Sequence, residues 1–167
     1  MSKSEQGINT QRFQVIPRSL IFVTDQKKVL LLKGAAHKRL WANKYNGIGG
    51  HIEKGEDIYE GAARELKEES GLAADPLWLC GSIMIDAGET TGIHLFVFRG
   101  SYQGGALQPS NEGELEWVGF DQITDFPLVE DLKVILPEIL KLNPGQMLYA
   151  RYWYDDRDQL QIKLKLV

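Results

Sequence analysis

One segment in the middle of the chain limits the possible folds more than any other, because it marks both ends of a helix. A glycine-rich turn, residues 46–50 (NGIGG), leads into a polar loop, and a helix is predicted from about Asp57 to Ser70. Asp57 forms a capping box with Glu60, three residues later. Gly71 suits the left-handed position just past the last helical turn. The segment therefore predicts a turn, a loop and a helix in a fixed order.

The predicted helix carries its glutamates beside its buried face. At about 100° per residue, its apolar side chains form one contiguous arc, and Glu65, Glu68 and Glu69 lie together at the margin of that arc, flanked by Arg64. Three glutamates can simply form a solvated face. However, carboxylates three and four residues apart repel each other, and a divalent cation removes that repulsion. All-oxygen ligands suit Mg²⁺ or Mn²⁺, so the helix offers a candidate metal site.

Charge is distributed unevenly along this chain of 167 residues, whose formal net charge is −4. Residues 53–69 contain seven acidic and three basic side chains, so this stretch alone accounts for the net charge. Between Asp25 and Glu53, six basic residues occur without an acidic one. The overall balance argues against a general electrostatic grip on a nucleic acid polymer or an anionic membrane.

The remaining elements follow from apolar patterning and turn residues. Residues 1–10 are polar and predicted to be flexible, and residues 11–167 are predicted to form a single domain. The expected elements are a hairpin of strands at 14–24 and 29–33, a loop at 34–45, strands at 77–85 and 92–99, a loop at 101–113, a strand at 116–120, a helix at 131–142, and a hairpin at 146–154 and 160–166.

The sequence also indicates a compartment. Cys80 is the only cysteine, so no intramolecular disulfide can form. The longest apolar runs are four residues, and residues 1–10 have no apolar signal-peptide core. We therefore expect a soluble, cytoplasmic protein without a membrane partner.

The spacing around the acidic helix resembles a known family motif. The motif begins at Gly50, continues after five residues with Glu56, and after seven more with residues 64–72 (RELKEESGL). This pattern matches the Nudix box at every fixed position. The surrounding chain looks like a MutT-type Nudix hydrolase. This resemblance implies an α/β (α+β) fold, in which a mixed sheet lies between helices as an α/β/α sandwich. It also implies cleavage of nucleoside diphosphates linked to another moiety, with water as nucleophile and usually Mg²⁺ as cofactor.

The resemblance assigns roles to particular residues. It implies that Glu65, Glu68 and Glu69 bind the metal, one of them also activating water, and that Arg64 orients a glutamate. The Gly49 carbonyl could add a metal oxygen. Gly49 and Gly50 let the backbone approach a ligand closely.

The chain has a run at 41–50, a run at 111–117 and a closing hairpin at 149–167. These segments look similar to the 8-oxo-purine nucleoside triphosphate diphosphatases. In that subgroup an asparagine at the place of Asn46 binds the purine, and a glutamate at the place of Glu112 assists the metal. Asp131 falls approximately where a base-reading acid lies, but the alignment slips by a residue there, and a helix N-terminal acid beside Glu130 is the favoured explanation. Lys33 and the basic loop 38–44 could compensate phosphate charge, or be solvated. Asn46 could also be an ordinary turn residue.

Three functions stay open at this level. The leading hypothesis is Mg²⁺-dependent cleavage of a nucleoside triphosphate, such as an oxidised purine, to monophosphate and pyrophosphate. The alternatives are hydrolysis of ADP-ribose or another nucleotide conjugate, with the 101–113 loop holding a second sugar, and a non-catalytic Nudix-fold binding module. The expected partner is a small-molecule nucleotide, and the chain could be a monomer or a homodimer.

Overall fold

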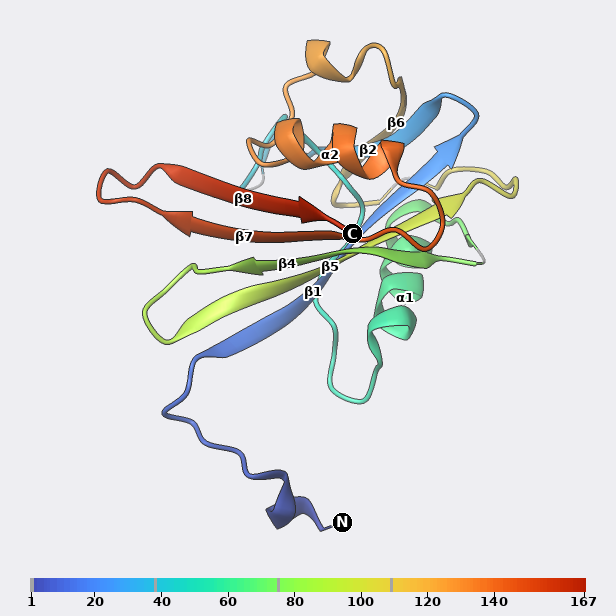
Figure 1. The fold of residues 1–167 in the computed structure, drawn as a ribbon. Helices are drawn as coiled ribbons and strands as arrows, with labels where there is room; N and C mark the ends of the chain where they lie inside the picture. The colour runs from blue at the N-terminus through green and yellow to red at the C-terminus, as the bar shows by residue number, and fades with distance from the viewer. Residues whose placement is uncertain (1, 38, 75, 109) are drawn as a thin grey trace.

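A computed structural model describes residues 2–37, 39–74, 76–108 and 110–167. Within these ranges, eight strands form one mixed sheet with the order β3-β2-β1-β5-β4-β7-β8, and β6 pairs with β2. Helix α1 lies on one side of this sheet and helix α2 on the other (Figure 1). Lys38, which belongs to the predicted basic loop, lies outside the described residues.

The first half of the sheet is the predicted hairpin. Strand β1 (Gln14–Asp25) turns at Gln26 and Lys27 into β2 (Lys28–Gly34), and the two strands are antiparallel. The short strand β3 (Tyr45–Asn46) pairs with the end of β2.

The glycine-rich run, residues 46–50, is predicted to be a turn. In the structure it instead continues beyond β3 as extended backbone along β1. Ile48 bridges Ile21, and the Ser19 N–H donates to the Gly50 carbonyl at 2.8 Å. Gly49 has a φ of 149°, and a Cβ on it would lie 2.2 Å from the Ser19 carbonyl oxygen. A side chain therefore does not fit where this run meets β1.

Helix α1 (Ile58–Ser70) begins and ends where its capping residues predict. The Asp57 side chain accepts hydrogen bonds from the N–H groups of Tyr59 and Glu60, at 2.8 and 2.9 Å. Gly71 adopts the left-handed conformation, with a φ of 74°, and its N–H returns to the Lys67 carbonyl. Local capping thus fixes both ends of the helix that carries the glutamates.

The second half of the chain completes the sheet. β5 pairs in parallel with β1, β4 pairs in parallel with β7, and β7 and β8 form the predicted C-terminal hairpin. The elements are β4 (Trp78–Ile85), β5 (Thr91–Ser101), β6 (Gly113–Gly119), α2 (Leu132–Lys141), β7 (Leu148–Tyr154) and β8 (Leu160–Leu166), with short 3₁₀ turns η1 (Lys3–Gln6) and η2 (Ile123–Asp125). The predicted flexibility of residues 1–10 and the single domain over 11–167 stay predictions.

Two apolar cores lie on opposite faces of the sheet. Alternate residues of β1 point to different faces: Ile21 and Val23 pack with α1, whereas Leu20 and Phe22 pack with α2. Both faces of a central strand are buried only when each is covered by another layer. The predicted α/β/α sandwich is therefore confirmed.

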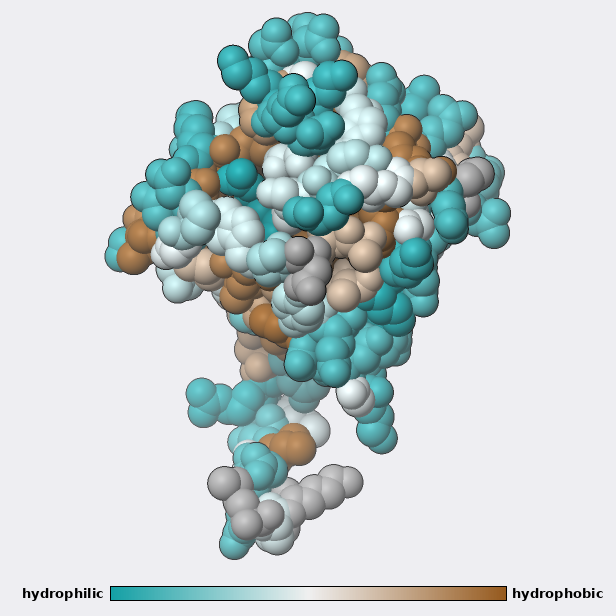
Figure 2. All heavy atoms as spheres, turned by 90° about the vertical axis from the view of Figure 1, so that its right-hand side faces the viewer, coloured by the Kyte–Doolittle hydropathy of each residue, from teal (hydrophilic) through white to brown (hydrophobic). Residues whose placement is uncertain are grey.

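The surface carries little contiguous apolar area on the face in view in Figure 2. Hydrophilic residues cover its upper and lower-right parts, and hydrophobic ones appear as separate spots. No helix in the described ranges is long and apolar enough to cross a membrane.

Candidate active site

Arg64 on α1 is the centre of the carboxylate cluster. Its guanidinium donates to both oxygens of Glu56, with Nε–Oε1 at 2.6 Å and Nη2–Oε2 at 3.1 Å. One nitrogen, Nη1, also donates to Glu65 Oε1 at 2.9 Å and to Glu68 Oε2 at 3.1 Å. Nη2 reaches the His51 carbonyl at 3.0 Å. The predicted orienting role of Arg64 therefore has a geometric basis, because one side chain contacts two of the three helix glutamates.

Glu56 is the partner that sequence reasoning treated only as a motif position. Its hydrogen bond with Arg64 lowers the pKa of its carboxyl group, and a hydrogen bond from the Glu53 N–H, at 2.9 Å, adds to the effect. Glu56 thus connects the loop before α1 to the guanidinium. Its place in the motif, with seven residues between it and Arg64, was the available signal, since it puts an acid just ahead of the helix.

The glycine run supports the other glutamate contacts. Glu69 is 8% exposed, and its Oε2 accepts a hydrogen bond from the Gly49 N–H at 3.1 Å. A Cβ on Gly50 would lie 2.5 Å from Glu65 Oε1 and 2.7 Å from Oε2. The Glu65 carboxylate therefore lies directly against the backbone of Gly50, in space that a side chain would fill. The acidic helix and the glycine run form one site.

The donor set fits a hard divalent cation. Glu65, Glu68 and Glu69 offer carboxylate oxygens, and Glu65 and Glu68 are drawn to the same nitrogen of Arg64. Across the described ranges, no three Asp, Glu, His or Cys side chains converge at metal-binding distance. The metal roles of these glutamates and of the Gly49 carbonyl stay predictions.

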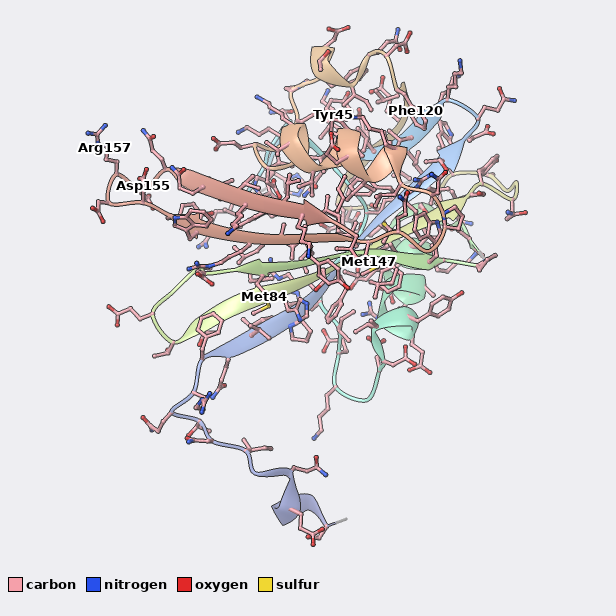
Figure 3. All side chains as sticks on the ribbon, viewed as in Figure 1. Tyr45, Met84, Phe120, Met147, Asp155 and Arg157 are labelled. Atoms are coloured by element: carbon pink, nitrogen blue, oxygen red, sulfur yellow. The ribbon has the colours of Figure 1, made fainter. Side chains whose placement is uncertain are left out.

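A second group of predicted site residues lies around Tyr45, which is labelled beside α2 in Figure 3. Lys33 Nζ lies 6.0 Å from the centre of the Tyr45 ring, within cation–π range. The Tyr45 hydroxyl donates to Glu116 at 2.5 Å, and burial, together with this carboxylate, raises the pKa of Tyr45 to about 12. Asn46 follows on β3, where its side-chain oxygen accepts from the Gly47 N–H at 2.8 Å. Asn46 therefore makes the local contact expected of a turn residue.

Asp131 is brought near this second group by main-chain bonds. The Val129 N–H donates to the Tyr45 carbonyl at 3.0 Å, which places the start of α2 beside β3. Asp131 is the N-cap residue of α2. Burial raises the pKa of Asp131, while backbone N–H groups at the helix start oppose the increase. Its carboxyl is thus more easily protonated than that of an ordinary exposed aspartate.

Glu112 lies in the loop before β6 and not on α1. Its carbonyl accepts from the Ala35 N–H at 3.1 Å, and its own N–H donates to the Ser110 hydroxyl at 3.2 Å. Its part in metal binding stays a prediction. This loop lines a groove of about 680 Å³, together with Lys33 and residues 34–37. Sequence reasoning did not foresee that Lys33 borders this groove.

The site and the sandwich define a class of protein, and comparison with known proteins agrees. Residues 16–139 match the model of the NUDIX domain. The chain belongs to the Nudix family and is a Nudix hydrolase of the MutT-like kind.

Particular relatives refine this assignment. The chain is 33% identical over 124 residues to the oxidized purine nucleoside triphosphate hydrolase of Mus musculus, covering 74% of this chain and 78% of that protein. It is 37% identical over 106 residues to the protein of the same name from Danio rerio, covering 63% and 67%. Among solved structures, the MutT protein of Bacillus halodurans is similar, with a TM-score of 0.77, 27% identity, and coverage of 90% of this chain and 98% of that one.

Proposed function

We propose that this Nudix hydrolase cleaves a free nucleoside triphosphate, with an oxidised purine such as 8-oxo-dGTP as the preferred class, to the monophosphate and pyrophosphate. The observation that carries the proposal is the Arg64 cluster, in which one guanidinium orients Glu65 and Glu68 while Gly49 holds Glu69. The names of the two relatives from mouse and zebrafish support the substrate class. A cytoplasmic site of action is part of the proposal.

The proposed mechanism depends on charge. When bound, Mg²⁺ would polarise the phosphorus centre and lower the pKa of a water molecule. Glu65, Glu68 and Glu69 would hold the cation, and one of them would accept the proton of the attacking water. Arg64 would keep Glu65 and Glu68 in place, because its bonds to Glu56 and to the His51 carbonyl fix its own position. Lys33 would balance phosphate charge at the border of the groove.

The group around Tyr45 is the proposed base site. Asn46 offers both a donor and an acceptor to a purine edge. Asp131, whose pKa is raised by burial, can donate a hydrogen bond when protonated. Asn46→Ala is expected to raise KM for purine nucleotides more than for pyrimidine nucleotides. Equal effects on both would remove Asn46 from base recognition.

A substrate panel tests the proposed function. Purified protein with Mg²⁺ is offered 8-oxo-dGTP, unmodified dNTPs, ADP-ribose and dinucleoside polyphosphates, and released monophosphate is measured. Glu69→Gln should abolish turnover, because the variant keeps the shape of the side chain but loses its charge. Circular dichroism and the melting temperature serve as the folding control. A folded Glu69→Gln variant with near-normal turnover would exclude Glu69 from the metal site.

A second candidate is a nucleoside diphosphate conjugate such as ADP-ribose. The groove of about 680 Å³ beside Lys33 favours it, since Ser110 and Asn111 of the long loop line that groove and could contact a second sugar. A higher kcat/KM for ADP-ribose than for any triphosphate in the panel would select this candidate. Binding of nucleotides without turnover of any panel member would instead indicate a non-catalytic module.

A further inference from the structure

Part of the sheet face that carries α1 extends beyond that helix. In Figure 1, α1 lies beneath one end of the sheet, whereas the β7–β8 hairpin continues past it. Leu148, Ala150 and Tyr152 of β7 pack into the core on the α2 side. Because side chains alternate along a strand, Tyr149 and Arg151 face the side of the sheet that α1 leaves uncovered.

Two registered rows of side chains cross this face. One row runs Ser19, Phe96, Ser82, Tyr149, Lys165 from β1 to β8. The adjacent row runs Pro17, His94, Met84, Arg151, Lys163 through the same strands. The first row begins beside the candidate active site, where the Ser19 N–H donates to the Gly50 carbonyl. The face is therefore continuous with the edge of that site.

The outer part of these rows, together with the half-buried Trp153 two residues beyond Arg151 on β7, combines aromatic and basic side chains. We call Tyr149, Arg151, Trp153, Lys163 and Lys165 the β7–β8 face. Tyr149 is 46% exposed, the Arg151 side chain is 61% exposed, and both lysines are exposed. The Arg151 guanidinium lies 5.2 Å from the centre of the Trp153 ring and forms an ion pair with Asp86 at 2.6 Å. Asp86 offsets the charge of Arg151, so Lys163 and Lys165 give this face its positive local charge.

Protection of a sheet edge explains the lysines of the β7–β8 face but not its aromatic residues. Lysines on an edge strand such as β8 discourage pairing with another chain. Tyr149, which is exposed, and Trp153, which is half-buried, lie on β7, whose two edges pair with β4 and β8, so edge protection does not explain these aromatic side chains. A second copy stacked on the same face would bring the three basic residues against each other, which disfavours a homodimer there.

We propose that the β7–β8 face binds single-stranded nucleic acid. Bases would stack on Tyr149 and Trp153, and phosphates would contact Lys163, Lys165 and Arg151, the combination that holds single strands without reading their sequence. The net charge of −4 argues against a general grip on nucleic acid, but this face has the opposite sign. The proposal does not depend on the substrate of the hydrolase.

Fluorescence anisotropy tests the proposal with labelled oligo-uridine RNA and oligo-thymidine DNA of about ten nucleotides. The wild-type protein, at low salt and without Mg²⁺, should bind both, with an affinity that falls as salt rises. K163E/K165E should weaken binding by at least about tenfold, and Tyr149→Ala by roughly tenfold. Turnover of free nucleotides by K163E/K165E should equal that of the wild type.

A matched control reverses the charge of two lysines that lie outside the β7–β8 face. Lys27→Glu combined with Lys133→Glu alters two exposed lysines outside the face, so it should leave oligonucleotide binding nearly unchanged. Equal losses in this control and in K163E/K165E would overturn the proposal, because binding would then follow total charge. It would also fail if the wild type bound no oligonucleotide at low salt, or bound only anionic phosphatidylserine vesicles.

Discussion

Single residues in the glycine run decide where the carboxylates of α1 lie. Gly49 and Gly50 are adjacent, yet what surrounds them differs. The missing Cβ of Gly49 faces the Ser19 backbone, and that of Gly50 faces the end of the Glu65 side chain. Backbone cannot move as cheaply as the end of a flexible side chain. The two glycines therefore have partly separate purposes: Gly50 leaves room for Glu65, whereas Gly49 lets the backbone meet β1 and also donates its N–H to Glu69.

Alanine substitutions should separate these purposes. Gly50→Ala is expected to leave the melting temperature within a few degrees of the wild type while lowering kcat, because Glu65 must move away from a Cβ 2.5 Å from its Oε1. A displaced carboxylate typically costs 10- to 100-fold in activity or metal affinity. Gly49→Ala should instead destabilise the protein by roughly 1–3 kcal/mol, because of its backbone conformation and the clash with Ser19. Urea unfolding and steady-state kinetics on both variants provide the measurements.

The Glu56–Arg64 pair should make stability depend on pH. The pKa of Glu56 is lowered from 4.5 in the folded protein, mainly by its hydrogen bond with Arg64. The folded state therefore favours the charged form, and the contribution is complete above pH 4.5 and lost as pH falls through the folded pKa. Urea unfolding between neutral pH and pH 3 should show this loss in the wild type and a smaller one in Glu56→Gln. If the wild type and Glu56→Gln lost stability identically as pH falls, the Glu56–Arg64 pair would not contribute to the pH dependence of stability.

At the scale of elements, the caps of α1 set where the helix begins and ends. Ala62 and Leu66 are buried against the sheet, but much of the helix surface is charged. The Asp57 carboxylate satisfies two N–H groups at the start of α1, and this start follows directly on the loop anchored by Glu56. The position of the glutamates along α1 therefore depends on where the cap begins the helix.

Removal of the cap has a defined expected result. Asp57→Ala should destabilise the protein by about 1 kcal/mol and lower the melting temperature by roughly 2–4 °C. Asp57→Ser should restore most of the loss, since serine also accepts from these N–H groups. Thermal unfolding by circular dichroism measures both effects. A loss that serine fails to restore would indicate that charge at this position, and not capping, stabilises the helix.

Elements with local signals were predictable, and contacts between distant elements were not. Asp57, Glu60 and Gly71 mark α1 within the sequence, and the alternation around Ile162 marks β8. The pairing of residues 48–51 with β1 depends on β2 leaving that edge of β1 free, which no local pattern reveals. In the same way, motif spacing identified the helix glutamates, but the contact of Glu69 with Gly49 requires the fold.

At the scale of the whole molecule, Arg99 connects the sheet to α2. Its Nη1 donates to the carbonyls of Ile139 and Leu142, both at 2.9 Å, and its guanidinium lies 5.3 Å from the centre of the Trp78 ring. Burial lowers the pKa of Arg99. The cation therefore binds carbonyl groups at the C-terminal end of α2, where the helix offers few N–H donors; the Ile139 carbonyl also accepts the Leu142 N–H at 3.2 Å.

Arg99→Ala should cost about 2–3 kcal/mol in the free energy of unfolding, because hydrogen bonds from a charged donor to partly buried carbonyls are lost. Arg151→Ala is the comparison, since it removes an exposed ion pair worth at most about 1 kcal/mol. Chemical denaturation of the two variants gives the difference. Equal losses would mean that Arg99 does not hold α2 in place.

The parallel pairing of β1 with β5 has a consequence for biosynthesis. β1 ends at Asp25, whereas β5, which pairs with one edge of β1, ends at Ser101. This edge of β1 therefore stays unpaired until the ribosome has released most of the chain. In the same way, one edge of β4 stays unpaired until β7 has been synthesised. Such non-local contacts make folding slow, on the order of milliseconds to seconds. Until then the nascent chain presents an open apolar strand, which is the state in which it would need a chaperone.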